Sequence, residues 1–362
     1  MTRKSFHGMN YRQCAASGLW LSEVGLGLWK WGDPGYDGSR IGEHEAFAVL
    51  DRALELGVTH WDTANSYNAG SGNSERLLGR YLRQRDWQTR DAIVLATKIR
   101  NPVRSEHEMQ REFSPNQMGA SRKYVMQAVE ASLQRLQTDY VDILYHHAPA
   151  KHPDGTWETP LEETWSAFDD LIRQGKVRYA AVSNRTGTEL IEENAVLRSV
   201  SAPRNTHLIA VQNRYNLVDR DKVSTGAEPE DEFLRILRSE GTALVPMVPL
   251  AVGFLTGRYR RDHLDESGRL ASSADKGWAE AYLTEQNFAL IDLLDEIAAA
   301  HDASIAGVAI AWLLSHEEVP SVIAGVTRME HLEDNARATD LVLSPEELTR
   351  LNQVSMPATS TR

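Results

Sequence analysis

Side chains that can do acid–base chemistry follow three short apolar segments of the sequence. The first segment ends in Asp62, with Tyr67 five residues later; the second ends in Lys98, and the third in His146 and His147. A free phenol has a pKa of about 10, and a nearby ammonium group favours its anion and lowers that pKa. Lys98 beside Tyr67, with Asp62 holding the ammonium charged, would therefore form a proton relay to a carbonyl oxygen. This chemistry needs no metal and no nucleophile.

The three segments are predicted to be strands, at Val58–Asp62, Ile93–Lys98 and Val141–His146. In a barrel of parallel strands, the carboxyl ends of all strands meet on one face. One such side chain at a strand end is usually structural, whereas several on consecutive strands favour a shared site.

The rest of the chain alternates apolar strand-like segments with helical ones, which predicts an α/β protein with a closed (β/α)8 TIM barrel. The other strands are expected at Val24–Trp29, Val177–Ser183, Leu208–Gln212, Ala243–Val248 and Val319–Ala324. Helices are expected at Glu43–Leu56, Ser74–Arg85 with Ser74 as N-cap, Ser121–Leu136, Pro160–Gly175, Thr186–Val200, Asp231–Gly241, Glu285–His301, Ile305–His316, Met329–Ala338 and Pro345–Val354.

This set includes two helices in the C-terminal half beyond the barrel repeat, and a β-hairpin is expected within Met9–Val24. An open doubly wound sheet is the competing fold, but Gly25-x-Gly27 does not continue into the expected dinucleotide fingerprint. No repeat or linker divides the chain, so one domain is expected over residues 1–362.

Composition excludes several classes of partner. The formal net charge is −12, whereas nucleic acids and anionic membranes usually require a basic face. The single cysteine, Cys14, excludes an internal disulfide and a cysteine-rich metal site. The N-terminal residues do not resemble a signal peptide. We therefore expect a cytoplasmic protein without nucleic-acid or membrane partners, and the sequence leaves a homo-oligomer open.

Three long loops follow predicted strand ends, at Ile99–Ala120, Ala148–Thr159 and Leu250–Leu283. Long loops on a compact barrel are usually functional. The first two are rich in charged residues and prolines, which suggests a pocket for a sugar-like or otherwise polar carbonyl compound.

Several short motifs, in order along nearly the whole chain, resemble those of the aldo-keto reductase superfamily. They are Gly25–Trp29, Asp62-Thr63-Ala64-x-x-Tyr67, Ser74-Glu75, Thr97-Lys98, Asp142–Pro149, Gly175–Arg178, Val182-Ser183-Asn184, Gln212–Leu217, Pro249-Leu250, Gly253–Gly257 and Gly325–Arg328. Those around Asn213–Leu217 and Gly253–Tyr259 are most similar to the branch that holds potassium-channel beta subunits and bacterial glyceraldehyde-3-phosphate reductase-like enzymes.

The resemblance implies a barrel that binds NADPH without a Rossmann domain and reduces aldehydes or ketones. It implies that Tyr67 is the proton donor, that Lys98 and Asp62 tune it, and that His147 orients the substrate. The family places this histidine five residues after the strand's aspartate, which selects His147. Neighbouring strand residues point to opposite sides, so His146 is expected to face the helices. A metal site at the two histidines with His152 would need convergent spacing, and we expect no metal.

The resemblance also implies a set of cofactor contacts. They are Gly27, Leu28, Trp29, Asp62, Ser183, Asn184, Gln212, Met247, Pro249, Leu250, Gly253, Leu255, Gly325, Thr327, Arg328, His331, Asp334 and Asn335. Arg328 would hold the adenosine 2′-phosphate, since guanidinium groups bind phosphate bidentately. The sequence departs from the family at Met247, where an aromatic ring is usual, at His331, where Gln or Arg is common, and at Asp334, where Glu is common.

Three functions remain as hypotheses at this point. The first is an NADPH-dependent carbonyl reductase acting on a small-molecule carbonyl substrate, reversible in principle. The second is a cofactor-binding regulatory or sensor subunit with little turnover, and His147 argues against it because some such subunits carry Asn there. The third is an unrelated barrel hydrolase or lyase, which would need metal ligands or paired carboxylates that the sequence does not show convincingly.

Overall fold

The computed structural model describes residues 3–104, 112–266, 268–271 and 276–356. Among these residues, eight parallel strands form one sheet in the order β10-β9-β8-β7-β6-β5-β4-β11. The strands are β4 (Val24–Gly27), β5 (His60–Asp62), β6 (Val94–Ile99), β7 (Val141–His146), β8 (Val177–Ser183), β9 (Ala210–Gln212), β10 (Ala243–Leu244) and β11 (Val322–Gly325).

The two ends of this sheet are joined into a closed barrel. Leu244 N donates to Glu318 O at 2.8 Å, and Ile323 N donates to Pro246 O at 3.2 Å. These bonds connect the β10 segment to the β11 segment, so the sheet has no free edge at the join. The predicted (β/α)8 barrel is confirmed.

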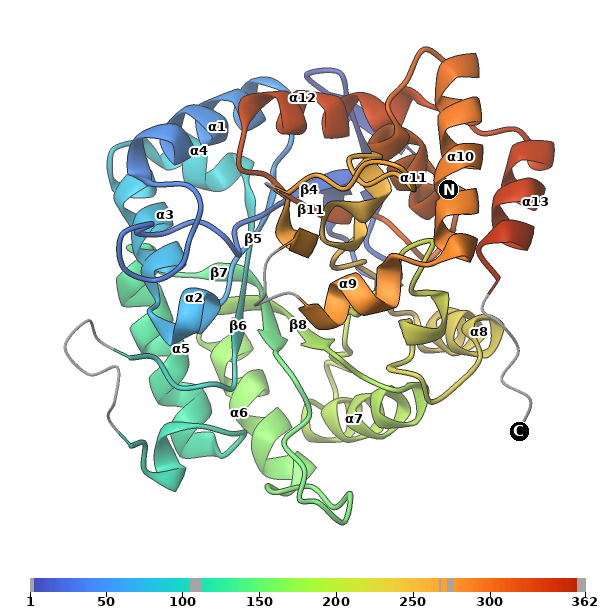
Figure 1. The fold of residues 1–362 in the computed structure, drawn as a ribbon. Coiled ribbons are helices and arrows are strands. Elements are labelled where there is room, and N and C mark those ends of the chain that lie inside the picture. The colour runs from blue at the N-terminus through green and yellow to red at the C-terminus, as the bar shows by residue number, and fades with distance from the viewer. Residues whose placement is uncertain (1–2, 105–111, 267, 272–275, 357–362) are drawn as a thin grey trace.

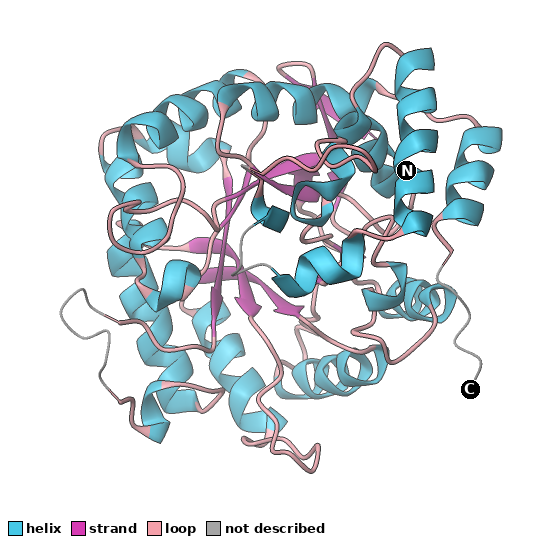
Figure 2. Cartoon of the chain, in the orientation of Figure 1, coloured by secondary structure: helices cyan, strands magenta, loops and turns pink. Residues whose placement is uncertain are grey.

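Helices surround the strands on all sides in the view of Figure 2. The helices that alternate with the strands are α1 (Glu43–Glu55), α3 (Asn73–Arg83), α5 (Arg122–Leu136), α6 (Leu161–Arg173), α7 (Gly187–Val200), α8 (Glu230–Glu240), α11 (Ile305–Leu314) and α12 (Met329–Arg337). The two extra C-terminal-half helices are α10 (Glu285–Ala300) and α13 (Pro345–Val354), which lie together at the outside of the barrel (Figure 1). Short helices α2 (Tyr67–Gly70), α4 (Trp87–Ala92) and α9 (Lys276–Tyr282) were not predicted.

The N-terminal segment forms a three-stranded antiparallel sheet of β1 (Arg3–Phe6), β2 (Met9–Gln13) and β3 (Trp20–Ser22). The predicted hairpin is the β2–β3 pair, and β1 adds a strand to it. Cys14 follows β2, and its Sγ lies 3.5 Å from Ile209 O, inside the barrel at the start of β9. This sheet therefore covers the end of the barrel opposite the carboxyl ends of the strands.

Several predicted boundaries are wrong, and proline explains two of the differences. β10 is shorter than the predicted Ala243–Val248 because Pro246 has no N–H to continue the ladder. β11 begins at Val322 rather than Val319, after Pro320. The N-cap of α3 is Gly72, not Ser74, and Ser74 Oγ instead donates to Leu28 O at 2.9 Å.

The described residues contain no single helix long and apolar enough to cross a membrane. α10 and α11 pass that test only as a pair, bent by 93°.

Candidate active site

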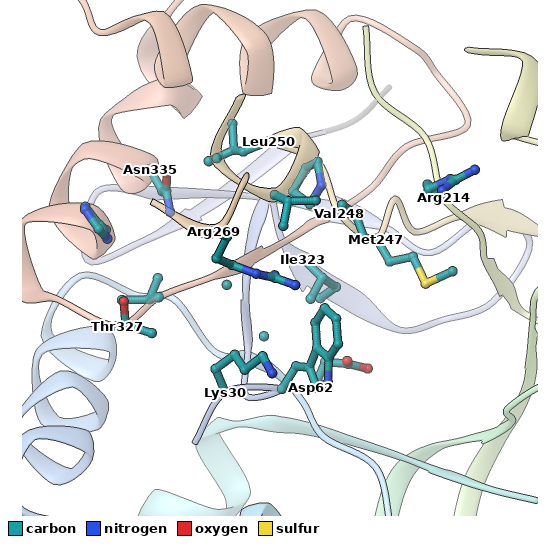
Figure 3. A pocket seen from close by; sticks show the side chains of 18 of the residues that line it. Lys30, Asp62, Arg214, Met247, Val248, Leu250, Arg269, Ile323, Thr327 and Asn335 are labelled. Carbon is teal, nitrogen blue, oxygen red and sulfur yellow. The ribbon is translucent and has the colours of Figure 1, made fainter. Parts of the chain in front are cut away.

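The carboxyl ends of the barrel strands open into a cavity of about 1080 Å³. Asp62, Tyr67 and His147 lie on its wall, and Lys98 lies directly behind them with a fully buried side chain. Figure 3 looks into this cavity, with Asp62 near its centre. The structure thus brings together all four residues predicted from the strand ends.

Asp62, Tyr67 and Lys98 form one hydrogen-bonded triangle. Lys98 Nζ donates to Asp62 Oδ2 at 2.5 Å, to Tyr67 Oη at 2.8 Å and to Thr63 O at 3.0 Å. Tyr67 Oη donates to the same Asp62 oxygen at 3.1 Å. The three donors of the ammonium group are all used, which makes this buried charge tolerable.

Tyr67 is held in this triangle by an unusual loop. It begins the short helix α2, in which Asn68 and Ala69 have positive φ values of 54° and 58°. Asn68 Nδ2 donates to Trp31 O at 2.7 Å, which ties the loop to the segment after β4. A left-handed conformation is costly outside glycine, and such strain clusters at functional sites.

Burial and Asp62 determine the protonation of Tyr67. Burial raises the pKa of Tyr67 well above its usual value. The Asp62 carboxylate raises it further, because its negative charge and the hydrogen bond that it accepts from the phenol both favour the protonated form. Burial also lowers the pKa of Lys98, an effect that Asp62 opposes. Burial and Asp62 together outweigh any lowering by Lys98, whose effect on the pKa of Tyr67 stays a prediction. Tyr67 remains a protonated phenol that can donate.

His147 completes the site as a neutral imidazole. Its ring centroid lies 6.1 Å from that of Tyr67, at an interplanar angle of 75°. Burial, followed by the charge of Lys98, lowers the pKa of His147 to about 3. A neutral imidazole at physiological pH carries one N–H, which can donate to a substrate oxygen.

His146 points away from the cavity, as predicted. Its Nδ1 lies 2.7 Å from Nη2 of the buried Arg185, and its ring packs against Phe168 of α6. His146 and His147 therefore face opposite sides of the strand and share no metal site. Among the described residues, no group of three or more His, Cys, Asp or Glu side chains could hold a metal ion.

Two amide side chains, Gln212 of β9 and Asn184 just after β8, hydrogen-bond residues of the predicted catalytic set. Gln212 Nε2 donates to Asp62 Oδ1 at 3.0 Å. Asn184 Nδ2 donates to His147 O at 2.9 Å and to Ser183 Oγ at 3.0 Å. Ser183 Oγ in turn donates to Gln212 O at 2.7 Å. These bonds link Asp62 and His147 to the predicted nicotinamide contacts.

Most of the predicted cofactor contacts line the cavity. They are Gly27, Trp29, Asp62, Asn184, Gln212, Met247, Pro249, Leu250, Gly253, Gly325, Thr327, His331, Asp334 and Asn335. Thr327 and Asn335 lie on one side of it, and Met247 on the other (Figure 3).

Four predicted contacts do not line the cavity. Three of them are fully buried: Leu28, Ser183 and Leu255. Ser183 contributes indirectly, since its Oγ accepts a hydrogen bond from Asn184, which does line the cavity. Arg328 is exposed at the N-cap of α12, so its role in binding the 2′-phosphate stays a prediction.

Sequence reasoning missed most of the polar rim of the cavity. The missed residues include Lys30, Arg40, Ser66, Asn101, Arg214, Lys222, Thr225, Arg258, Arg269 and Trp278. Most lie on loops, where sequence carries no periodic signal. Arg214 is the exception, because it follows Gln212 by two residues and side chains two apart share a strand face.

Comparison with known proteins supports the family resemblance that the motifs indicated. A sequence model of the Aldo/keto reductase family matches residues 23–356. The chain is 33% identical over 349 residues to "L-glyceraldehyde 3-phosphate reductase" of Escherichia coli O157:H7, covering 95% of this chain and 92% of that protein. It is 31% identical over 348 residues to "Probable voltage-gated potassium channel subunit beta" of Oryza sativa subsp. japonica, covering 96% of each. It is 29% identical over 364 residues to "Versiconal hemiacetal acetate reductase" of Aspergillus parasiticus, covering 96% and 98%.

The chain belongs to the aldo/keto reductase family, in the branch that the motifs predicted. The family and the relatives named as reductases make it an oxidoreductase whose chemistry is carbonyl reduction.

Proposed function

We propose that this protein is an NADPH-dependent reductase that converts an aldehyde or ketone into the alcohol. The observation that carries the proposal is the hydrogen-bonded triangle of Tyr67, Lys98 and Asp62, with neutral His147 beside it, at the wall of a large cavity. A protonated phenol backed by an ammonium group is suited to protonating an oxygen that gains negative charge.

The cavity lining fits a phosphorylated dinucleotide. Amide groups of Asn184 and Gln212 line the cavity and suit a carboxamide, and Gln212 adjoins Asp62. Arg258 and Arg269 line the same cavity and suit phosphate groups, as does the N-terminus of α12. When bound, NADPH would supply the hydride that reduces the carbonyl carbon.

The residues of the chain would supply the proton and the orientation. Tyr67 gives its phenolic proton to the carbonyl oxygen as that oxygen gains charge, and the new O–H belongs to the alcohol product. Lys98, 2.8 Å from the phenol oxygen, then stabilises the phenolate until a proton from water restores it. His147 donates its single N–H to the same carbonyl oxygen and so fixes the carbonyl in place.

The substrate is proposed to be a small polar carbonyl compound. Names of two relatives mention a sugar phosphate and a hemiacetal acetate as the compounds those proteins reduce. Polar groups of Ser66 and Asn101 on the rim support a polar substrate here. Part of the loop Ile99–Ala120, from which the polar pocket was predicted, lies outside the described residues. With a net charge of −12, a cytoplasmic protein without nucleic-acid or membrane partners is also proposed.

A regulatory subunit that binds cofactor with little turnover is the second candidate. The likeness to a potassium-channel beta subunit favours it, whereas His147 in contact with the cavity favours an enzyme. A panel of aldehydes, ketones and sugars, with NADPH absorbance as the readout, separates the two. Turnover of a carbonyl compound supports the reductase; NADPH binding without any turnover would support the regulatory subunit instead.

A further inference from the structure

The cavity is far more basic than the protein that contains it. Six lysine and arginine side chains line it, against the carboxylates of Asp62 and Asp334, although the chain carries a net charge of −12. The six are Lys30, Arg40, Arg214, Lys222, Arg258 and Arg269. Asp62 is already neutralised by Lys98. Although Arg258 also pairs with Asp265 outside the lining, the positive side chains of the lining favour anionic ligands.

Three of these cations, Lys30, Arg258 and Arg269, lie toward the end of the cavity where the nucleotide is proposed to bind. Arg258 and Arg328 both act on His331, whose pKa burial lowers and these positive charges lower further. Arg269 and Lys30 flank the Trp29 indole, at 5.0 and 4.8 Å from its ring centroid. Lys30 and Arg269 both extend toward the middle of the cavity, one below the other in the view of Figure 3.

Arg214 lies at the other end. In Figure 3 it stands beside Met247, on the opposite side of the cavity from Thr327 and Asn335. The backbone of Arg214 forms a parallel bridge with that of Met247, so the β9–β10 pairing extends past the ends of both strands. Arg214 therefore continues the face of Gln212, roughly 7 Å further along the strand direction. That places it one layer above the amide that adjoins Asp62.

The surroundings of Arg214 hold the side chain without using its hydrogen-bond donors. Its guanidinium carbon lies 4.9 Å from the ring centroid of Trp278, in α9. Its Nε is 3.7 Å from Asp219 Oδ1, which is beyond hydrogen-bonding distance. Asp219 is itself fixed by Tyr282 Oη at 2.5 Å and Asn216 Nδ2 at 2.8 Å. Among the described residues, none accepts a hydrogen bond from the Arg214 guanidinium, so its donors are available to a ligand.

A second cation lies at the same end. Lys222 lines the cavity with Thr225, from the segment that follows β9. Its ammonium pairs only with the neighbouring, exposed Asp221 among the described residues. An exposed pair of this kind contributes little stability and exchanges readily. A ligand carboxylate or phosphate could therefore recruit Lys222 at little cost.

We propose that the substrate is a carbonyl compound carrying a carboxylate or phosphate group, and that Arg214 is the specificity-determining residue that binds this group. The proposal rests on the reductase function above, and names the substrate class of that site. A planar guanidinium with free donors binds either oxyanion through two parallel hydrogen bonds. Lys222 adds charge to the same subsite.

Matched pairs of aldehydes test this proposal. Glyceraldehyde 3-phosphate is compared with glyceraldehyde, and 4-oxobutanoate with butanal, in the parent protein and in Arg214→Met. We expect kcat/KM for the charged member to fall about 10- to 100-fold, the usual effect of losing hydrogen bonds to a charged group. We expect the neutral member to fall less than about threefold, which shows that the variant is folded. Loss with only one of the charged aldehydes identifies whether phosphate or carboxylate is the natural group.

A binding experiment keeps the proposal independent of turnover. The NADPH complex is titrated by calorimetry with glycerol 3-phosphate and 4-hydroxybutanoate, and with glycerol and butan-1-ol, none of which has a carbonyl to reduce. Charged alcohols should bind more tightly than neutral ones to the parent and to Arg235→Met, a control on the exposed face of α8. Arg214→Met should lose that preference. Equal binding of charged and neutral alcohols by the parent, or a preference that survives Arg214→Met, overturns the proposal; absence of carbonyl turnover alone overturns only the reductase function.

Discussion

The base of the cavity and its rim are built in opposite ways. At the base, which holds the buried residues around Tyr67, Asp62 and Lys98 come from neighbouring strands and have 1% of their side-chain surface exposed. Lys98 donates a hydrogen bond to Tyr67, and Asp62 accepts one from Gln212. At the rim, Trp29 has 40% of its surface exposed, Arg40 comes from a loop, and Lys222 ends a short 3-10 helix.

This difference separates chemistry from recognition. A buried network in which every donor is used tolerates no single loss, because an unpaired buried charge is costly. Exposed ion pairs on loops contribute little to stability, so they can change without harming the fold. Substitutions at the base should therefore affect stability and turnover together, whereas those at the rim should affect ligand preference alone.

Lys98→Met should have the largest effect on the base. It leaves the Asp62 carboxylate buried without its cation, which should lower the free energy of unfolding by about 3–5 kcal/mol. Turnover should also be lost, because no ammonium group remains to stabilise the phenolate of Tyr67. Urea unfolding and NADPH oxidation measure the two effects.

The surface variant Lys176→Met is the matched control, since its exposed pair with Glu130 should contribute less than about 1 kcal/mol. The double variant Asp62→Asn/Lys98→Met should recover part of the lost stability without recovering turnover. Equal stability of Lys98→Met and Lys176→Met would contradict the buried network.

His60, two residues before Asp62 on β5, should give the base an acid sensitivity. Burial lowers the pKa of His60 to about 4. Its Nδ1 lies 2.9 Å from Ser321 Oγ, and its Nε2 has no hydrogen-bond partner among the described residues. The unfolded chain, with an ordinary histidine pKa of about 6.5, binds a proton first. The penalty is therefore absent above pH 6.5, and grows as pH falls toward 4.

Between those pH values, this residue should remove about 2–3 kcal/mol from the free energy of unfolding. The His60→Gln variant should not lose this part of the free energy of unfolding, so its stability should fall less steeply on acidification than that of the parent. The exposed His44→Gln should behave as the parent does. Identical pH slopes in the His60→Gln variant and the parent would show that His60 is not the buried group responsible.

Arg328→Ala should show a smaller, selective effect on cofactor preference, although Arg328 does not itself line the cavity. NADPH affinity should fall about tenfold and NADH affinity less than about threefold, since only NADPH has the 2′-phosphate. Stability should not change, because the side chain is exposed. Cofactor fluorescence titrations measure both affinities. Arg337→Ala, at the other end of α12, is the control, and equal losses of NADPH and NADH in Arg328→Ala would remove the 2′-phosphate assignment.

The base was predictable from sequence and the rim largely was not. Short apolar segments located Asp62, Lys98 and His147 at strand ends, and alternation placed His146 on the far side. Burial and the Asp62 carboxylate, which together raise the pKa of Tyr67, were not foreseen, because spacing does not reveal that its hydroxyl donates to Asp62. The rim residues are brought together by loops, and their positions depend on tertiary contacts such as Arg214 on Trp278.

The most direct test of the central claim is a single-turnover measurement on Tyr67→Phe. The variant is mixed with NADPH and a carbonyl substrate of the parent protein, and NADPH absorbance and alcohol product are followed together. Because the variant lacks only the phenolic hydroxyl, we expect NADPH affinity close to that of the parent and a rate of reduction about 10³-fold lower, within the range for loss of a general acid. Reduction at the parental rate would contradict the assignment of Tyr67 as the proton donor.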